Sequence, residues 1–332
     1  MQSNDLERTG QMPPLGSHAL RTALPLMALL AGAICLGSSP LLVRLSYLEP
    51  TATAFYRVAL AAPAFLLFPL IYTSASGASA QSNATRADLL WLVAAGGLFA
   101  LDLLCLHWSL RFTSVANATL FLNFAPFFVA LGAWAILGEQ PTLRIMLSFI
   151  IALAGVALLV GGVSTGQAHR LAGDALGVLA GAAYGGYLLL VSRFRRHMST
   201  SRVMGVTTLS CAVFLLPAAL VMGESLVPTT AIAWVLLLAL ALVTHAGGQG
   251  LLVFAMKYLP ATTSSVTLLL QPVVAALGAW LLFSEKLQPW QIVGGCIVLA
   301  AIVLCHDAVS RTRADPKKAA RHQAPAAAKL SE

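Results

Sequence analysis

The chain of 332 residues has a mean hydropathy of +0.83, and only 10% of its residues are charged, whereas a soluble domain carries about 25%. Hydrophobic residues make up 58% of the sequence and come in long runs, which excludes a soluble protein and indicates a polytopic membrane protein. The net charge of +8 lies in tails and short loops, so it does not indicate nucleic-acid binding, and the five cysteines lack metal-ligand spacing and predict no disulfide framework.

Ten apolar stretches follow a polar N-terminal segment. Residues 1–21 contain two adjacent prolines and no periodicity, and a disordered tail is expected there. The basic segment 307–332 is expected to be a second disordered tail. A membrane-spanning helix needs about 20 apolar residues, and the predicted spans are 22–43, 51–72, 88–109, 113–137, 143–162, 173–192, 203–222, 229–256, 260–283 and 288–306.

The distribution of Lys and Arg predicts the orientation in the membrane. If both termini are cytoplasmic, fifteen of these residues fall in segments inside the cell and four in segments outside it. Cytoplasmic segments carry the excess of positive charge in most membrane proteins. We therefore expect both termini on the cytoplasmic side of a bacterial inner membrane.

One part of the sequence occurs twice. Residues 111–139 and 257–285 correspond at an offset of 146 without a gap, and both contain Ala-Leu-Gly-Ala-Trp and end in glutamate. The match divides the chain into two five-helix halves, 22–162 and 173–306, joined by a linker over 163–172. Because five is odd, the second half enters the membrane from the opposite side, and inverted repeats are typical of secondary transporters.

Several local features also carry a resemblance. They are the helix break Gly37-Ser38-Ser39-Pro40, the triplet Phe55-Tyr56-Arg57, and the fourth and ninth spans, which contain Pro126 and Pro272 and end in Gly138-Glu139 and Ser284-Glu285. Together they resemble the ten-helix EamA family of the drug/metabolite transporter superfamily, with Leu36 where that family usually has tryptophan. The resemblance implies an all-α fold, a cavity lined mainly by helices 1, 3, 4, 6, 8 and 9, and transport of small metabolites, amino acids among them.

Ionisable side chains inside a membrane are costly and are therefore candidates for function. For Asp102 we favour binding of a proton or a substrate ammonium over a structural hydrogen bond. His245 and Gln249 share one helix face, and binding of a carboxylate or a proton is weighed equally against interhelical hydrogen bonding. A structural role is favoured for His107, beside Trp108 near the outer surface, and for Arg57, which is expected to snorkel outward or to anchor the first turn.

Polar uncharged side chains add further candidates for cavity lining. Thr263, Thr267 and Gln271 recur every four residues and lead to Pro272. This stripe favours a cavity, because irregular backbone inside a membrane must be buried or must face water. Asn117 and Asn123 point about 120° apart, so both cannot face one cavity squarely. The remaining candidates are Tyr184 and Tyr187, and Ser38 and Ser39 beside the third helix break at Pro40.

The repeated residues Glu139, Glu285, Trp134 and Trp280 are interpreted as structural, since each glutamate stands where it favours the N-terminus of the next helix. There is no nucleotide-binding loop and no metal-binding motif, so no cofactor is expected. The sequence predicts a secondary transporter that exports amino acids or related compounds, with the proton as a candidate coupling ion. A channel and an intramembrane enzyme remain alternatives, and both a monomer and a homodimer are open.

Overall fold

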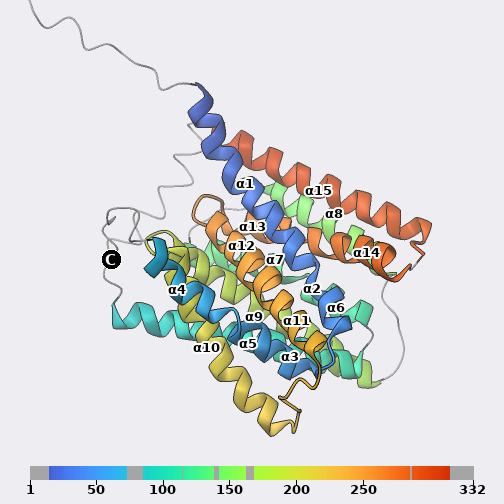
Figure 1. Cartoon of the computed structure of the whole chain (residues 1–332). Helices are drawn as coiled ribbons and strands as arrows, with labels where there is room; N and C mark the ends of the chain where they lie inside the picture. Colours follow the sequence, from blue (N-terminus) through green and yellow to red (C-terminus); the bar gives the residue numbers. More distant parts are fainter. Residues whose placement is uncertain are drawn as a thin grey trace, which may run out of the picture.

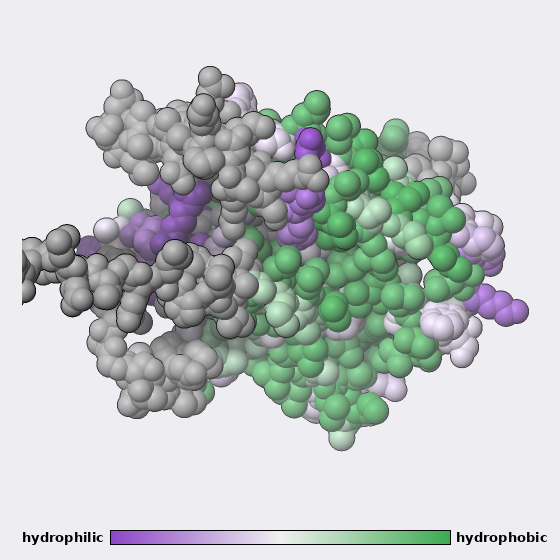
Figure 2. All heavy atoms as spheres, turned by 90° about the horizontal axis from the view of Figure 1, so that it is seen from above, coloured by the Kyte–Doolittle hydropathy of each residue, from purple (hydrophilic) through white to green (hydrophobic). Residues whose placement is uncertain are grey.

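The computed structural model describes residues 15–72, 85–113, 115–137, 142–161, 168–284 and 286–314, and every regular element in these ranges is a helix (Figure 1). Ten spans within them are long and apolar enough to cross a membrane. Figure 2 shows hydrophobic side chains gathered in a broad band, with hydrophilic ones toward its two ends. The predicted all-α membrane protein with ten transmembrane helices is confirmed.

The first half contains five spans, several of them built from more than one helical piece. They are α1 (Leu15–Gly37) with α2 (Ser39–Leu45), α3 (Pro50–Ala59) with α4 (Ala62–Tyr72), α5 (Arg86–Phe112), α6 (Val115–Leu122) with α7 (Ala125–Gly132) and the π-helix η1 (Ala133–Leu137), and α8 (Leu143–Val160).

The second half repeats this number of spans. They are α9 (Ala168–Arg195), α10 (Thr200–Val221), α11 (Ala231–Ala239) with the π-helix η2 (Leu240–Gln249) and α12 (Gly250–Ala255), α13 (Ala261–Thr267) with α14 (Leu270–Phe283), and α15 (Pro289–Ala314).

Three helices extend beyond the boundaries expected from hydropathy. The helix α1 begins within the predicted N-terminal tail, α9 begins within the predicted linker, and α15 ends within the predicted C-terminal tail. A helix satisfies its own backbone hydrogen bonds in water as well as in lipid, so its ends need not coincide with the apolar run. The rest of both predicted tails, 1–14 and 315–332, lies outside the described residues.

Proline interrupts equivalent spans of the two halves. Between α6 and α7 the chain leaves the helix at Asn123, three residues before Pro126, and between α13 and α14 it leaves at Leu268, four residues before Pro272. Proline lacks an N–H group, and its ring clashes with the carbonyl of the preceding turn. Pro40 likewise stands at the start of α2. A fourth interruption, before Pro63, is not among the predicted breaks.

The packing between the halves is nearly symmetric. The fifth spans, α8 and α15, lie side by side (Figure 1), and α5 packs along α9 as α1 packs along η2 and α12. A Cβ atom added to Gly132 of α7 would meet Leu189 of α9, and one added to Gly278 of α14 would meet Leu41 of α2. Glycine thus allows the same close approach twice, as in many membrane proteins.

The repeated Ala-Leu-Gly-Ala-Trp sequence therefore has two different functions in packing. Its glycines lie between helices, whereas Trp134 and Trp280 are 59% and 50% exposed. Both tryptophans belong to the hydrophobic surface that a bilayer covers. The repeated residues Glu139 and Glu285 lie outside the described residues.

The seam between α8 and α15 should tolerate no added atoms at its closest point. A Cβ at Gly294 would lie 2.6 Å from the carbonyl oxygen of Gly155, whereas one at the neighbouring Gly295 would lie 3.8 Å from Val273. We expect Gly294→Ala to destabilise the protein by about 1–3 kcal/mol, as overpacking does, and Gly295→Ala to be tolerated. Melting temperatures of the two detergent-purified variants check this, and equal values would contradict the described packing.

Candidate functional site

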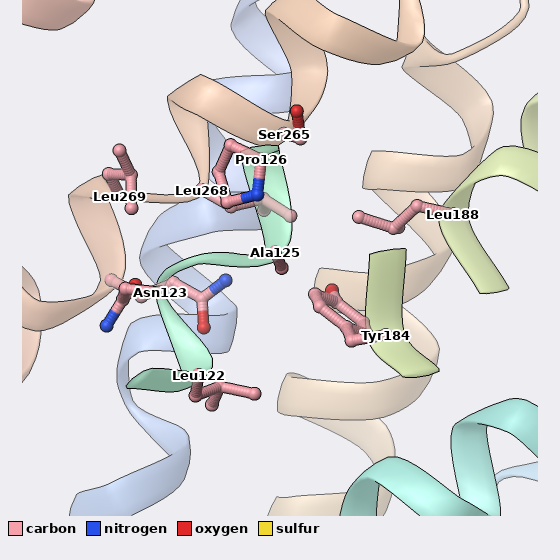
Figure 3. A pocket seen from close by; sticks show the side chains of 10 residues that line it. Leu122, Asn123, Ala125, Pro126, Tyr184, Leu188, Ser265, Leu268 and Leu269 are labelled. Carbon is pink, nitrogen blue, oxygen red and sulfur yellow. The ribbon is translucent and has the colours of Figure 1, made fainter. Parts of the chain in front are cut away.

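A cavity lies between the two proline breaks (Figure 3). Its volume is about 40 Å³. Three spans line it: the α6–α7 break, the α13–α14 break and α9. Its lining residues are Leu122, Asn123, Ala125, Pro126, Tyr184, Leu188, Ser265, Leu268, Leu269 and Gln271.

The breaks determine how the backbone borders this cavity. Pro126 has no N–H group with which to complete a helical hydrogen bond to the carbonyl of Leu122. On the other side, the Leu268 carbonyl accepts from the N–H of Gln271 in a tighter turn, at 2.9 Å. Gly181 of α9 lies against the first break, where an added Cβ would be 3.0 Å from the Leu122 oxygen. Irregular backbone is thus enclosed by protein at the centre of the assembly, as a bilayer requires.

Few polar side chains reach the cavity. Asn123 is partly exposed to it, and its side-chain Nδ2 donates to the Thr119 carbonyl at 2.7 Å. Ser265 donates to the Thr262 carbonyl at 2.8 Å, and Gln271 and Tyr184 are partly exposed. An apolar cavity with a few convergent polar groups is the usual form of a small-molecule site.

An aromatic stack runs alongside the cavity. The Phe99 ring of α5 stacks on Tyr187 of α9 with ring centroids 4.9 Å apart, and on His245 of η2 with centroids 5.7 Å apart. Tyr184 stacks on Tyr187 at 5.9 Å and lines the cavity. The stack therefore joins three spans from both halves to the wall of the cavity.

His245 and Gln249 are buried behind this stack and are not among the residues that line the cavity. They are 1% and 0% exposed and belong to η2, a π-helix of the kind that is frequent at functional sites. His245 Nε2 lies 2.9 Å from the Thr208 hydroxyl of α10, and the Gln249 amide donates to the Tyr187 hydroxyl at 3.2 Å. Both residues thus make hydrogen bonds between helices. Thr208 was not a predicted candidate, although it is a polar residue in an apolar span.

Asp102 is buried, at 4% exposure, and Arg57 is partly exposed, with its Nε atom buried. The Arg57 Nη1 atom donates to the hydroxyl of Ser39 at 3.1 Å. His107 is partly exposed, with its Nδ1 atom buried.

The remaining candidates are dispersed. Thr267 donates to the Thr263 carbonyl at 2.9 Å and lies 3.0 Å from His306 Nε2 of α15, and both threonines are fully buried. The helix break after Thr267 separates Gln271 from this stripe and turns it to the cavity. Ser38 donates to the Cys35 carbonyl at 2.7 Å. The side chain of Asn117 lies outside the described residues.

Comparison with known proteins shows which family the chain resembles. The EamA-like transporter family matches the chain twice, over residues 23–161 and 171–305. A probable terminal-alkyne amino-acid exporter of Streptantibioticus cattleyicolor is 30% identical over 231 residues, which are 68% of this chain and 74% of the relative. The pseudopaline exporter CntI of Pseudomonas aeruginosa is 26% identical over 231 residues, 69% of this chain and 78% of the relative.

A further relative and a solved structure agree with this match. An uncharacterized transporter of Archaeoglobus fulgidus is 25% identical over 268 residues, which are 79% of this chain and 89% of the relative. A solved crystal structure superposes with a TM-score of 0.74 at 16% identity and covers 87% of this chain and 98% of that chain, a likeness of fold. The inverted halves, the paired proline breaks and the twofold match agree, and the chain belongs to the EamA-like transporter family.

Proposed function

We propose that this transporter exports an amino acid or a related amphipathic metabolite across the bacterial inner membrane by alternating access. The single observation that carries the proposal is the cavity between the proline breaks of the two halves. A site held between two inverted repeats becomes open to either side when one half rocks against the other. A channel or an enzyme would not need this paired arrangement.

The lining of the cavity and the names of two relatives support this substrate class. The cavity is mostly apolar but has amide and hydroxyl groups at its edges, which suits a molecule with a polar head and an apolar remainder. Two of the relatives are exporters, one of a terminal-alkyne amino acid and one of pseudopaline, by their names.

The proton is our candidate for the coupling ion. Asp102 and His245 are ionisable and buried inside the membrane-spanning assembly, where such groups often form proton pathways. Coupling requires that an imposed pH gradient change the rate of substrate efflux from proteoliposomes. A rate that is independent of the gradient would exclude it.

Filling the cavity should stop transport without unfolding the protein. In proteoliposomes loaded with an unlabelled amino acid, we expect the wild-type protein to accelerate uptake of the same labelled amino acid. Gln271→Trp places an indole in the cavity. Because the indole occupies space that the substrate needs, it should weaken substrate binding and lower this counterflow by roughly tenfold or more. Leu277→Trp on the same helix is the control, because Leu277 is 46% exposed on the hydrophobic surface.

Three outcomes of this experiment would each contradict a different part of the proposal. Counterflow that persists in Gln271→Trp would show that substrate passes elsewhere. Absence of counterflow for every amino acid tested with the wild-type protein would contradict the proposed substrate class, and a current without counterflow would favour a channel.

The predicted orientation can be tested separately. A phosphatase, which is active only outside the cytoplasm, should be inactive when fused after residue 310 and active when fused after residue 286. The reason is the excess of Lys and Arg in the segments assigned to the cytoplasm. The reverse pattern of phosphatase activity in intact cells would invert the topology.

A further inference from the structure

The cavity between the proline breaks is more exposed at one end than at the other. The lining residues that are partly exposed are Leu122, Asn123, Tyr184 and Gln271. The rest of the lining is buried, and it includes Pro126, Leu188 and Ser265. Figure 3 shows the two groups at opposite ends of the cavity, with Ser265 above and Leu122 below.

The exposed end is the same end of the molecule in all three spans. Consecutive spans run in opposite directions, so the fourth and sixth spans run parallel and the ninth runs antiparallel to them. In the fourth and sixth spans the partly exposed residues precede the buried ones, and in the ninth span Gln271 follows Ser265. The proposed topology places this exposed end outside the cell. The cavity is therefore enclosed on the side that the same topology assigns to the cytoplasm.

The helix α13 lies on the enclosed side. It ends at the second proline break and packs against α7, α9 and α15, and all seven of its residues are buried. At the offset of 146 it corresponds to α6 of the first half, which lies toward the outer end, and there Thr119, Phe121 and Leu122 are partly exposed. Two helices that are equivalent in sequence are thus packed differently, as two inverted halves require when only one end is closed.

Hydroxyl groups dominate α13, although the helix is buried. Five of its seven residues are serine or threonine. Ser265 and Thr267 donate to carbonyls within the helix. Among the side chains that the structure describes, however, Thr263 Oγ1 and Ser264 Oγ are buried without a hydrogen-bond partner. A buried hydroxyl without a partner costs free energy that a hydroxyl in water does not. The composition of α13 therefore suits a helix that faces water in another conformation.

The ends of α13 allow it to move as a short separate piece. Pro260 stands at its N-cap, and the irregular backbone at Leu268 and Leu269 follows it. Serine, threonine and valine favour a helix less than alanine does, so packing against neighbouring helices, and not intrinsic propensity, holds α13 in place. A change in that packing can therefore displace α13 with little change in α14.

We propose that α13 is the cytoplasmic gate of this transporter. In the present structure α13 is packed against α7 and α9, and the cavity is accessible from the outer end. In the opposite conformation α13 separates from α7 and α9, and Thr263 and Ser264 then face the water through which the substrate reaches the cavity. The inference rests on the alternating access of the proposed function, and it adds which element closes the cytoplasmic path.

Cysteine labelling from each side of the membrane tests the gate. In Ser264→Cys and Thr263→Cys, the new thiol should react with a membrane-impermeant maleimide in inside-out vesicles and be protected in right-side-out vesicles. Ser148→Cys is the matched control, because Ser148 is a buried serine of α8 near the same end, with its hydroxyl donating to the Arg144 carbonyl. We expect Ser264→Cys to react about tenfold or more faster than Ser148→Cys, since its thiol is reached whenever the minor conformation forms.

A native thiol separates gating from unfolding. Peptide mass spectrometry reads each thiol separately, and Cys211 is fully buried in α10. Equal rates for Ser264→Cys and Ser148→Cys would overturn the proposal. Labelling of Ser264→Cys together with Cys211 would overturn it as well, because a loosened protein exposes both thiols.

A second measurement checks that the two ends of the cavity alternate. In the double variant Ser264→Cys/Gln271→Cys, the thiol at position 271 is first modified from the outer side with a bulky impermeant maleimide. An adduct at this position holds the cavity open to the outside, so later labelling at position 264 from the cytoplasmic side should fall by about tenfold. An unchanged rate would show that α13 opens independently of the outer end, which contradicts a gate.

Failure of this inference differs from failure of the proposed function. Labelling needs no substrate, so α13 can be identified as the gate even if no amino acid shows counterflow. If amino acids show counterflow while Ser264→Cys and Thr263→Cys stay protected, alternating access stands and the gate is another element. Should the phosphatase fusions invert the topology, the two sides of the membrane exchange in these expectations.

Discussion

A bilayer offers the main chain no hydrogen-bond partner, and this constraint governs the centre of the structure. Two proline residues, Pro126 and Pro272, remove N–H groups in the middle of spans that are otherwise helical. The carbonyls left without a helical donor cannot face lipid. Both breaks must therefore turn inward, and because they occupy equivalent positions in two inverted halves, they meet across a common space.

The helices around this space pack closely at equivalent positions of the two halves, and these contacts form a repeated packing frame. Glycine allows close contact at equivalent places, between α7 and α9 and between α14 and α2, and again where Gly155 faces Gly294. Such contacts need no polar partner and can form in both halves from the same sequence. The frame explains why the repeated stretch is best preserved at Ala-Leu-Gly-Ala-Trp, where one residue packs and another faces the bilayer.

The lining of the cavity departs from that symmetry. At the offset of 146, Leu122 corresponds to Leu268, but Asn123 corresponds to Leu269 and Ala125 to Gln271. Each half therefore places one amide at the cavity, Asn123 within its break and Gln271 just after its break. The charges are more one-sided still, because Asp102 corresponds to Gly248 at the same offset. A symmetric frame with an asymmetric lining can hold a substrate in one defined orientation.

The sequence by itself determined the ten spans, the division into two halves and the breaks at Pro40, Pro126 and Pro272, because apolar length and missing N–H groups act locally. It did not determine which polar groups meet. Thr267 meets His306, Gln249 meets Tyr187, and Arg57 donates to Ser39. Spans that are apolar on most faces carry little information about their rotation, so packing against neighbouring helices decides it. Only the tertiary structure therefore separated Gln271, which lines the cavity, from Thr263 and Thr267, which do not.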